Sequence, residues 1–178
     1  MKKILLSLCF VCCALWIGAG AAQAESVKVP VNKITDDGVG EAIGFITFTD
    51  DGKGGLDILM DVMGISEGQH GMHVHENPSC APAEKDGKKV AGLSAGGHFD
   101  PDKTGKHEGP VKHGHKGDLP AITADAKGEV KGELNAPNLA VKDLKGRAVI
   151  IHAGGDNYSD QPAPLGGGGA RIACGVIQ

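Results

Sequence analysis

Aromatic residues are scarce in this sequence of 178 residues, which has four phenylalanines, one tyrosine and one tryptophan. Phe10 and Trp16 both fall within the first 24 residues, which have the character of a leader. The core of the remaining chain must therefore be mostly aliphatic, and no aromatic surface is available on which nucleic acid bases could stack. The aromatic residues that remain are Phe45, Phe48, Phe99 and Tyr158.

A long hydrophobic run is also missing. Lys2 and Lys3 precede an apolar run over residues 4–17, and the small-residue pattern Ala22-Gln23-Ala24 follows it. A run of fourteen residues is shorter than the roughly 20 needed to span a bilayer. This order predicts a cleaved export signal over residues 1–24 rather than a membrane anchor.

The leader contains three cysteines, on one of which a lipid anchor is the alternative to simple cleavage. The residues directly before these thiols are Leu8, Val11 and Cys12, where a small residue would be expected. We therefore expect cleavage after Ala24, export of the mature chain and one domain formed by residues 25–178. The leader cysteines are Cys9, Cys12 and Cys13.

Positive charge is in short supply. The chain has 18 lysines and arginines against 22 aspartates and glutamates. Loss of Lys2 and Lys3 with the leader leaves 16 against 22, a formal charge of -6. Nucleic acid and anionic membranes are therefore poor partners, and neither is expected.

Only two of the five cysteines, Cys80 and Cys174, remain after cleavage. An even pair of cysteines in an oxidising compartment is normally bridged, so we expect a disulfide between them. The two lie 94 positions apart. In the chain-entropy model such a closure stabilises the fold by roughly 4 to 5 kcal/mol.

Short β-prone runs recur along the chain, separated by turn residues. Apolar and polar residues alternate in the run 44–49, and the breakers Asp36-Asp37-Gly38 and Asp50-Asp51-Gly52 predict hairpin turns. Only residues 139–144 suggest one short helical turn. The pattern predicts an antiparallel all-β sandwich or barrel. The expected strands are residues 27–34, 42–49, 56–63, 70–75, 119–124, 129–134, 148–152 and 171–177.

Two long segments interrupt this rhythm, residues 77–110 and 153–169, and both are rich in glycine, proline and charge. Loops of this length in a compact domain are usually functional or disordered. His98 and His107 lie in the first segment, and the second directly follows His152. The histidines therefore favour two functional loops.

All eight histidines lie between His70 and His152. In a strand, His73 and His75 on either side of Val74 would project from one face and form half of a metal site. The other candidate ligands are His98, His107, His115, Asp118 and His152.

Copper and zinc are the metals that imidazole nitrogens suit. Three imidazoles with one carboxylate suit a closed tetrahedral zinc site, whereas four imidazoles in tetragonal geometry favour Cu(II). Seven ligands can fill two four-coordinate sites only if one histidine is shared and deprotonated at both nitrogens. The residue types alone leave open which histidine that is.

Five motifs, in order along the chain, resemble the copper, zinc superoxide dismutase family. Three further stretches, 154–157, 159–162 and 164–169, resemble its bacterial periplasmic branch, which implies that the exported chain is located in the periplasm. The resemblance implies an eight-stranded Greek-key β-barrel of the sandwich type, with immunoglobulin-like architecture, over residues 25–178. The five motifs are Gly71-Met72-His73-Val74-His75-Glu76, Gly96-Gly97-His98-Phe99-Asp100-Pro101, Gly105-Lys106-His107-Glu108-Gly109-Pro110, His115-Lys116-Gly117-Asp118-Leu119-Pro120 and Arg171-Ile172-Ala173-Cys174-Gly175-Val176-Ile177.

The resemblance also implies one copper and one zinc per subunit, with His98 as the bridging imidazolate. Asp156 matches a carboxylate that orients one copper and one zinc histidine, and Arg171 matches an arginine that guides a small anion to copper. The disulfide would tie the first long loop to the last strand. The implied ligands are His73, His75, His98 and His152 for copper, and His98, His107, His115 and Asp118 for zinc.

Two histidines remain outside these sets. His70 matches a structural histidine of the family. His113 is an alternative to His115, although the sequence that leads into Asp118 favours His115. Lys85, Lys88 and Lys89 either extend a positive patch for the substrate or form a solvated loop face, and the latter is favoured.

The activity implied by the resemblance is disproportionation of superoxide by Cu(II)/Cu(I) cycling, in which His98 releases copper and takes a proton on reduction. One alternative is a periplasmic copper and zinc buffer or chaperone without turnover. The other is a secreted zinc hydrolase suggested by His73 and His75, which is disfavoured because Glu76-Asn77 follow where Asp-His would be needed. Family members occur as monomers and homodimers, and both states stay open.

Overall fold

The computed structural model describes residues 24–178. The expected export signal, residues 1–24, therefore lies outside the described residues except for Ala24. Within the described part of the chain, no helix is both long enough and apolar enough to cross a membrane.

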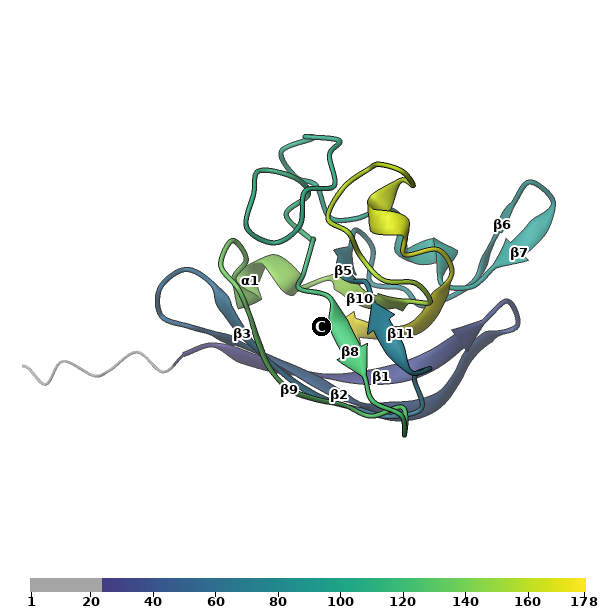
Figure 1. Ribbon diagram of the computed structural model, residues 1–178, viewed down its shortest axis with the longest axis horizontal. Coiled ribbons are helices and arrows are strands. Elements are labelled where there is room, and N and C mark those ends of the chain that lie inside the picture. Colours follow the sequence, from purple (N-terminus) through teal and green to yellow (C-terminus); the bar gives the residue numbers. More distant parts are fainter. Residues whose placement is uncertain (1–23) are drawn as a thin grey trace, which may run out of the picture.

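Seven strands form one curled antiparallel sheet (Figure 1), whose order is β5-β10-β11-β1-β2-β3-β9. The order places β9 beside β3 and β11 beside β1, so strands distant in sequence become neighbours, and the sheet curls so that its two ends turn toward each other (Figure 1). The expected all-β fold is confirmed. The strands are β1 (Ser26–Thr35), β2 (Gly38–Asp50), β3 (Leu56–Val62), β5 (Met72–His75), β9 (Val130–Ala136), β10 (Arg147–His152) and β11 (Arg171–Ile177).

The remaining elements are short. Two small antiparallel sheets pair β4 with β8 and β6 with β7. The expected turn near residues 139–144 is a one-turn helix, α1. The bounds are β4 (Gly68–His70), β8 (Ile122–Ala124), β6 (Ala83–Lys85), β7 (Lys88–Val90), α1 (Val141–Leu144) and the 3-10 turns η1 (Leu93–Ala95) and η2 (Leu165–Gly167).

The expected single strand over residues 70–75 is wrong in one respect, because it is divided at Gly71 into β4 and β5. The N–H of Gly71 donates to the carbonyl of Gly154 rather than to a strand partner. His70 pairs with Ile122 of β8, whereas Met72 pairs with Ile151 of β10. The chain thus changes partner at this glycine.

Side chains alternate between core and solvent along the central strands. In β3, Leu56, Ile58, Met60 and Val62 are buried while the residues between them are exposed. Such alternation is typical of an antiparallel sheet with one face on the core. Phe48 and Phe99 are the aromatic residues of the core cluster, and the rest of it is aliphatic, as the composition predicted.

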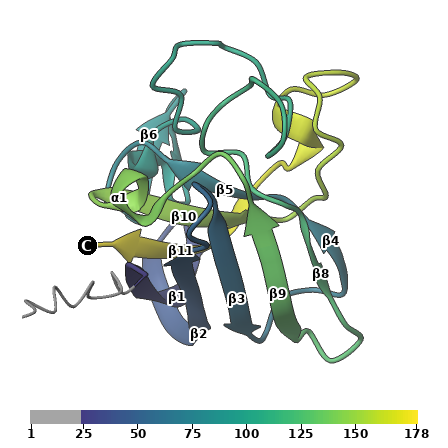
Figure 2. The same cartoon turned by 90° about the vertical axis from the view of Figure 1, so that its left-hand side faces the viewer.

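The two long loops gather at one end of the barrel (Figure 2), where they cover β5 and β10. The first contains the β6–β7 hairpin, which was not expected. Its turn residues Asp86 and Gly87 both have positive φ angles, 52° and 73°, as an Asp-Gly hairpin turn requires.

Gly44 marks a place where only glycine fits. Its φ is +139°, and a Cβ there would lie 2.1 Å from the carbonyl oxygen of Asp61 on β3. Gly132 in β9 has a similar φ of +129°, but a Cβ there would have no other atom within 4 Å. A side chain at Gly44 would therefore meet both backbone strain and a steric collision, whereas a side chain at Gly132 would meet backbone strain alone.

We expect Gly44→Ala to destabilise the fold by more than about 3 kcal/mol, because backbone strain and collision with β3 add together. Gly132→Ala should cost only the backbone part, roughly 1 to 2 kcal/mol. Urea unfolding of both variants measures the difference. Equal losses would show that the close approach of β2 and β3 does not constrain the barrel.

Candidate metal centre

The centre is built on β5, whose alternation places two histidines on one face. Val74 enters the hydrophobic core, whereas the imidazoles of His73 and His75 lie together outside it, and both side chains are fully buried. Isolated antiparallel bridges join His73 to Asp118 and His75 to His98. These bridges bring residues of the first long loop beside the strand.

Two sets of four side chains have their ligand atoms within 4.8 Å of one another. All members of both sets are buried. His73 and His98 belong to both sets. The first set is His73, His75, His98 and His152, and the second is His73, His98, His107 and Asp118.

In several of these imidazoles, one ring nitrogen is fixed by an outer partner. Nε2 of His73 donates to Asp156 Oδ2 (2.8 Å), Nδ1 of His75 donates to the Gly96 carbonyl (3.0 Å) and Nε2 of His107 donates to Asp156 Oδ1 (2.7 Å). Because a neutral imidazole carries one N–H, the contacts of His73 and His75 leave a lone pair on the other nitrogen of each ring. The other nitrogen of His107, Nδ1, lies 3.0 Å from Asp118 Oδ2.

Six buried ring nitrogens of the centre make no well-aligned hydrogen bond in the described structure, although two of them, Nδ1 of His107 and Nδ1 of His115, face the Asp118 carboxylate at 3.0 and 3.5 Å. Buried polar atoms are normally paired, so such a concentration requires an explanation. Nitrogen donors beside one carboxylate fit copper and zinc, and the outer hydrogen bonds are those that orient metal-binding histidines. The residues therefore fit a two-metal centre. The atoms are Nδ1 of His73, His107 and His115, and Nε2 of His75, His98 and His152.

His98 is placed to serve both sets. Its Nδ1 lies 3.0 Å from Asp118 Oδ1, while its Nε2 has no hydrogen-bond partner. His73 also belongs to both sets, but its Nε2 is held by Asp156 and only Nδ1 remains. The partner of His98 Nδ1, Asp118, is itself one of the possible ligands, whereas Asp156 belongs to neither set. Of the two histidines, His98 is therefore the one whose two nitrogens face two different groups of possible ligands.

A family model described as copper/zinc superoxide dismutase matches residues 42–177. The chain is 49% identical over 179 residues to a Cu-Zn superoxide dismutase of Escherichia coli K12, with 100% of both chains covered. This chain belongs to the copper/zinc superoxide dismutase family. The resemblance seen in the motifs is confirmed, and with it the superoxide dismutase class of activity.

Solved structures of copper/zinc superoxide dismutases have the same fold as this chain. The enzyme of Brucella abortus has a TM-score of 0.84 at 49% identity, covering 86% of this chain and 100% of its own. The enzyme of Salmonella enterica, described as monomeric, has a TM-score of 0.77 at 49% identity with the same coverage. The Greek-key barrel expected from the sequence is thereby confirmed.

The two histidines that compete for the zinc set lie in different surroundings. Nδ1 of His115 is buried and lies 3.5 Å from Asp118 Oδ1, although His115 stands outside the compact four-residue sets. His113 is exposed and borders a surface hollow with Lys112 and Lys116. The structure therefore brings His115, and not His113, to the centre.

His70 is buried but does not offer a ligand atom. Its Nδ1 lies 2.8 Å from the carbonyl oxygen of His152, and its Nε2 lies 2.8 Å from that of Ser66. Both ring nitrogens are thus engaged with backbone, in agreement with a structural residue.

Arg171 lies next to the first of the two sets, the one made of four histidines, because it is the cross-strand partner of His152. Its Nη1 donates to the Gly92 carbonyl (2.5 Å) and its Nη2 to the Gly96 carbonyl (2.6 Å). The Gly96 oxygen also accepts from His75. One carbonyl therefore fixes the arginine and a histidine together, a role of Gly96 that the sequence did not reveal.

The expected disulfide is confirmed. Cys80 and Cys174 are bonded, with their Cα atoms 5.7 Å apart. The bridge ties the first loop to β11, three residues from Arg171. The nearby lysines 85, 88 and 89 are exposed on the β6–β7 hairpin, which extends away from the barrel in Figure 1.

The buried histidines and aspartates of the centre differ in whether they are charged or neutral, because their pKa values are shifted in different directions. Burial lowers the pKa of His98 to about 4 and that of His152 to about 3, so both are neutral at physiological pH. Burial acts in the same direction on His107, but contacts with Asp118 and Asp156 outweigh it and raise its pKa to about 9. Despite burial, hydrogen bonds from histidines hold the pKa of Asp118 and of Asp156 well below the ordinary range.

We expect the stability of the metal-free chain to be greatest near pH 6.5. Below the ordinary histidine pKa of 6.5, the unfolded chain takes up protons that buried His98 and His152 resist, so stability falls toward pH 4. Stability contributed by protonated His107 is complete below pH 6.5 and is lost as the pH rises through about 9. Thermal unfolding from pH 4 to 9.5 tests this, and a steady rise or fall across the range would contradict it.

We expect His115→Ala to lower zinc affinity at least tenfold, because it removes a buried donor from the carboxylate-containing set. His113→Ala is the matched control, since its side chain is exposed two residues away, and it should bind zinc as the wild type does. Competition with a chromophoric chelator measures both. The reverse order of effects would place His113 in the zinc set.

Proposed function

We propose that this chain disproportionates superoxide at a copper site formed by His73, His75, His98 and His152 and a zinc site formed by His98, His107, His115 and Asp118. The observation that carries the proposal is the group of six buried imidazole nitrogens, one of them Nε2 of His98, that make no well-aligned hydrogen bond. The membership of this chain in the copper/zinc superoxide dismutase family supports the activity. Two superoxide anions and two protons would give dioxygen and hydrogen peroxide.

Bound copper would supply the one-electron exchange with superoxide, and bound zinc would supply a fixed positive charge without redox chemistry. The protein holds the ligands ready for both metals, because burial keeps His98 and His152 neutral and hydrogen bonds fix the tautomers of His73 and His75. The ring of His107 is held in place by Asp156. In the reduced state, Nε2 of His98 would hold a proton while Nδ1 stays beside Asp118.

Arg171 is the residue we assign to the substrate. A formal charge of -6 on residues 25–178 repels a small anion, so a local cation must attract superoxide to the site. The guanidinium lies beside His152 and is held in place by the carbonyls of Gly92 and Gly96. A fixed, permanently charged group suits this task better than a mobile lysine.

Export completes the proposal. Residues 1–24 would be removed, and residues 25–178 would act in the periplasm, where the disulfide between Cys80 and Cys174 is stable. The enzyme would act as a monomer or a homodimer, and the description of the Salmonella enterica enzyme as monomeric supports the former.

Purified protein loaded with copper and zinc should consume superoxide in a pulse-radiolysis or competition assay. The zinc-only protein is the control, because it retains the fold without a redox metal. Both metals bound without activity would contradict the proposal and favour the alternative of a copper and zinc buffer or chaperone.

Arg171→Leu should lower kcat/KM for superoxide by about tenfold or more, because electrostatic focusing contributes at least that factor. Arg171→Lys should restore part of the loss, and copper content measured on each variant shows that the ligands remain. Activity should fall with ionic strength less steeply in the leucine variant than in the wild type. An unchanged kcat/KM would remove Arg171 from the substrate path.

A further inference from the structure

Alternate residues of the second long loop reach across to the first. Asp156, Tyr158 and Asp160 each contact residues 107–121, which we call the zinc-ligand segment because it carries His107, His115 and Asp118. The residues between them bond within their own loop instead. The amide of Asn157 donates to the Gln161 carbonyl, and the Ser159 N–H donates to Asn157 Oδ1.

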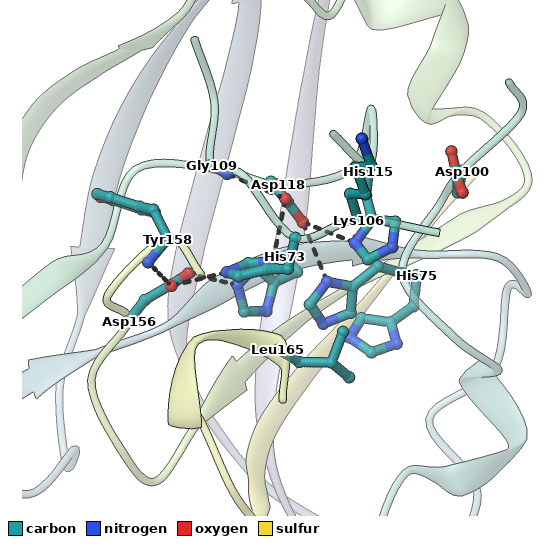
Figure 3. Close-up of polar contacts among 12 residues, drawn as sticks. His73, His75, Asp100, Lys106, Gly109, His115, Asp118, Asp156, Tyr158 and Leu165 are labelled. Carbon is teal, nitrogen blue, oxygen red and sulfur yellow. Dashed lines mark hydrogen bonds and ion pairs between the residues drawn. The ribbon is translucent and has the colours of Figure 1, made fainter. Parts of the chain in front are cut away.

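Tyr158 contacts the carboxylate that joins the two ligand sets. Its backbone N–H donates to Asp156 Oδ1 (2.8 Å), the oxygen that also accepts from His107 (Figure 3). The φ of Tyr158 is 56°, a conformation that residues other than glycine rarely adopt. Such a conformation persists only where the surrounding contacts hold it.

The side chain of Tyr158 provides those contacts. A Cβ on Gly109 would lie 2.7 Å from Cγ and Cδ1 of the tyrosine ring, so the ring lies directly on this glycine. The N–H of Gly109 in turn donates to Asp118 Oδ2 (3.2 Å). At the far end of the ring, the phenol oxygen accepts the N–H of Ala121 (2.9 Å). Tyr158 thus spans the chain on both sides of Asp118.

Asp160 holds the backbone of His107. Its Oδ2 accepts the N–H of His107 (3.0 Å), and its Oδ1 accepts the N–H of Leu165 in its own loop (3.2 Å). His107 is therefore fixed by two carboxylates, at its ring by Asp156 and at its backbone by Asp160.

We propose that Tyr158 and Asp160 are positioning residues that hold the zinc-ligand segment against Asp156 and so determine how long zinc is retained. Neither side chain contacts the proposed metals. Asp160 acts through the backbone of His107, itself a proposed zinc ligand. Tyr158 acts through Gly109, whose N–H donates to the carboxylate of Asp118, and through Ala121, three residues after Asp118. The inference rests on the zinc site of the proposed function.

The test uses the protein loaded with copper and zinc. Asp160→Ala and Tyr158→Leu should each release zinc to excess chelator about tenfold faster than the wild type, the lower end of the effect seen when outer partners of metal ligands are lost. Asn157→Ala is the matched control, because it removes hydrogen bonds of the same loop without touching the zinc-ligand segment. It should release zinc at the wild-type rate.

Conservative variants separate positioning from general loosening of the loop. Asp160→Asn keeps an acceptor oxygen for His107, and Tyr158→Phe keeps the ring on Gly109, so both should retain zinc better than the alanine and leucine variants. They also serve if Tyr158→Leu does not fold. With Co(II) in the zinc site, the visible spectrum should change in Asp160→Ala and stay unchanged in Asn157→Ala.

Release rates within twofold of wild type in both Asp160→Ala and Tyr158→Leu would overturn the inference. Equal acceleration in Asn157→Ala would overturn it too, because it would show a general effect of loop stability. A wild-type protein that binds no zinc at all would instead contradict the proposed function.

Discussion

The carboxylate of Asp156 contacts both halves of the metal centre, one oxygen on the ring of His73 and the other on the ring of His107. Each contact fixes an N–H outward and turns the opposite nitrogen inward. Burial disfavours the charged form of this carboxylate, but the N–H groups that donate to it outweigh burial and hold its pKa below the ordinary range, so it stays ionised. The relative orientation of the two ligand sets depends on this single group.

The barrel supplies the rigid part of this arrangement. Strand β5 presents His73 and His75 from one face, and β10 ends at His152 beside Arg171 of β11. The loops supply the other ligands, and each loop is fastened by a different means. The first is bridged to β11 by the disulfide, whereas contacts of Asp156, Tyr158 and Asp160 join the second to the first.

Much of the site could be predicted because its signals are local. The alternation of His73, Val74 and His75 has the period of a strand, and the same period placed Val74 in the core. The need for one shared histidine followed from the number of donors. The proposal that His98 is the shared residue could not follow from residue types, because it depends on the carboxylate that each ring faces, Asp156 for His73 and Asp118 for His98.

Other features depend on contacts between residues far apart in the sequence. The division of residues 70–75 at Gly71 arises from a hydrogen bond to Gly154, and the grip of Arg171 arises from carbonyls 75 and 79 residues away. No local sequence pattern specifies such distant partners. The β6–β7 hairpin is different, because its strands are close in sequence and the turn residues Asp86-Gly87 are a local signal that could have predicted it.

The most direct measurement is the electron paramagnetic resonance spectrum of Cu(II) in protein whose zinc site holds Co(II). If His98 joins the two sites through both ring nitrogens, magnetic coupling should suppress the isolated Cu(II) signal. Replacement of Co(II) by Zn(II) should restore that signal. An ordinary Cu(II) signal in the presence of Co(II) would contradict the account, because it would mean that no imidazole links the two sites.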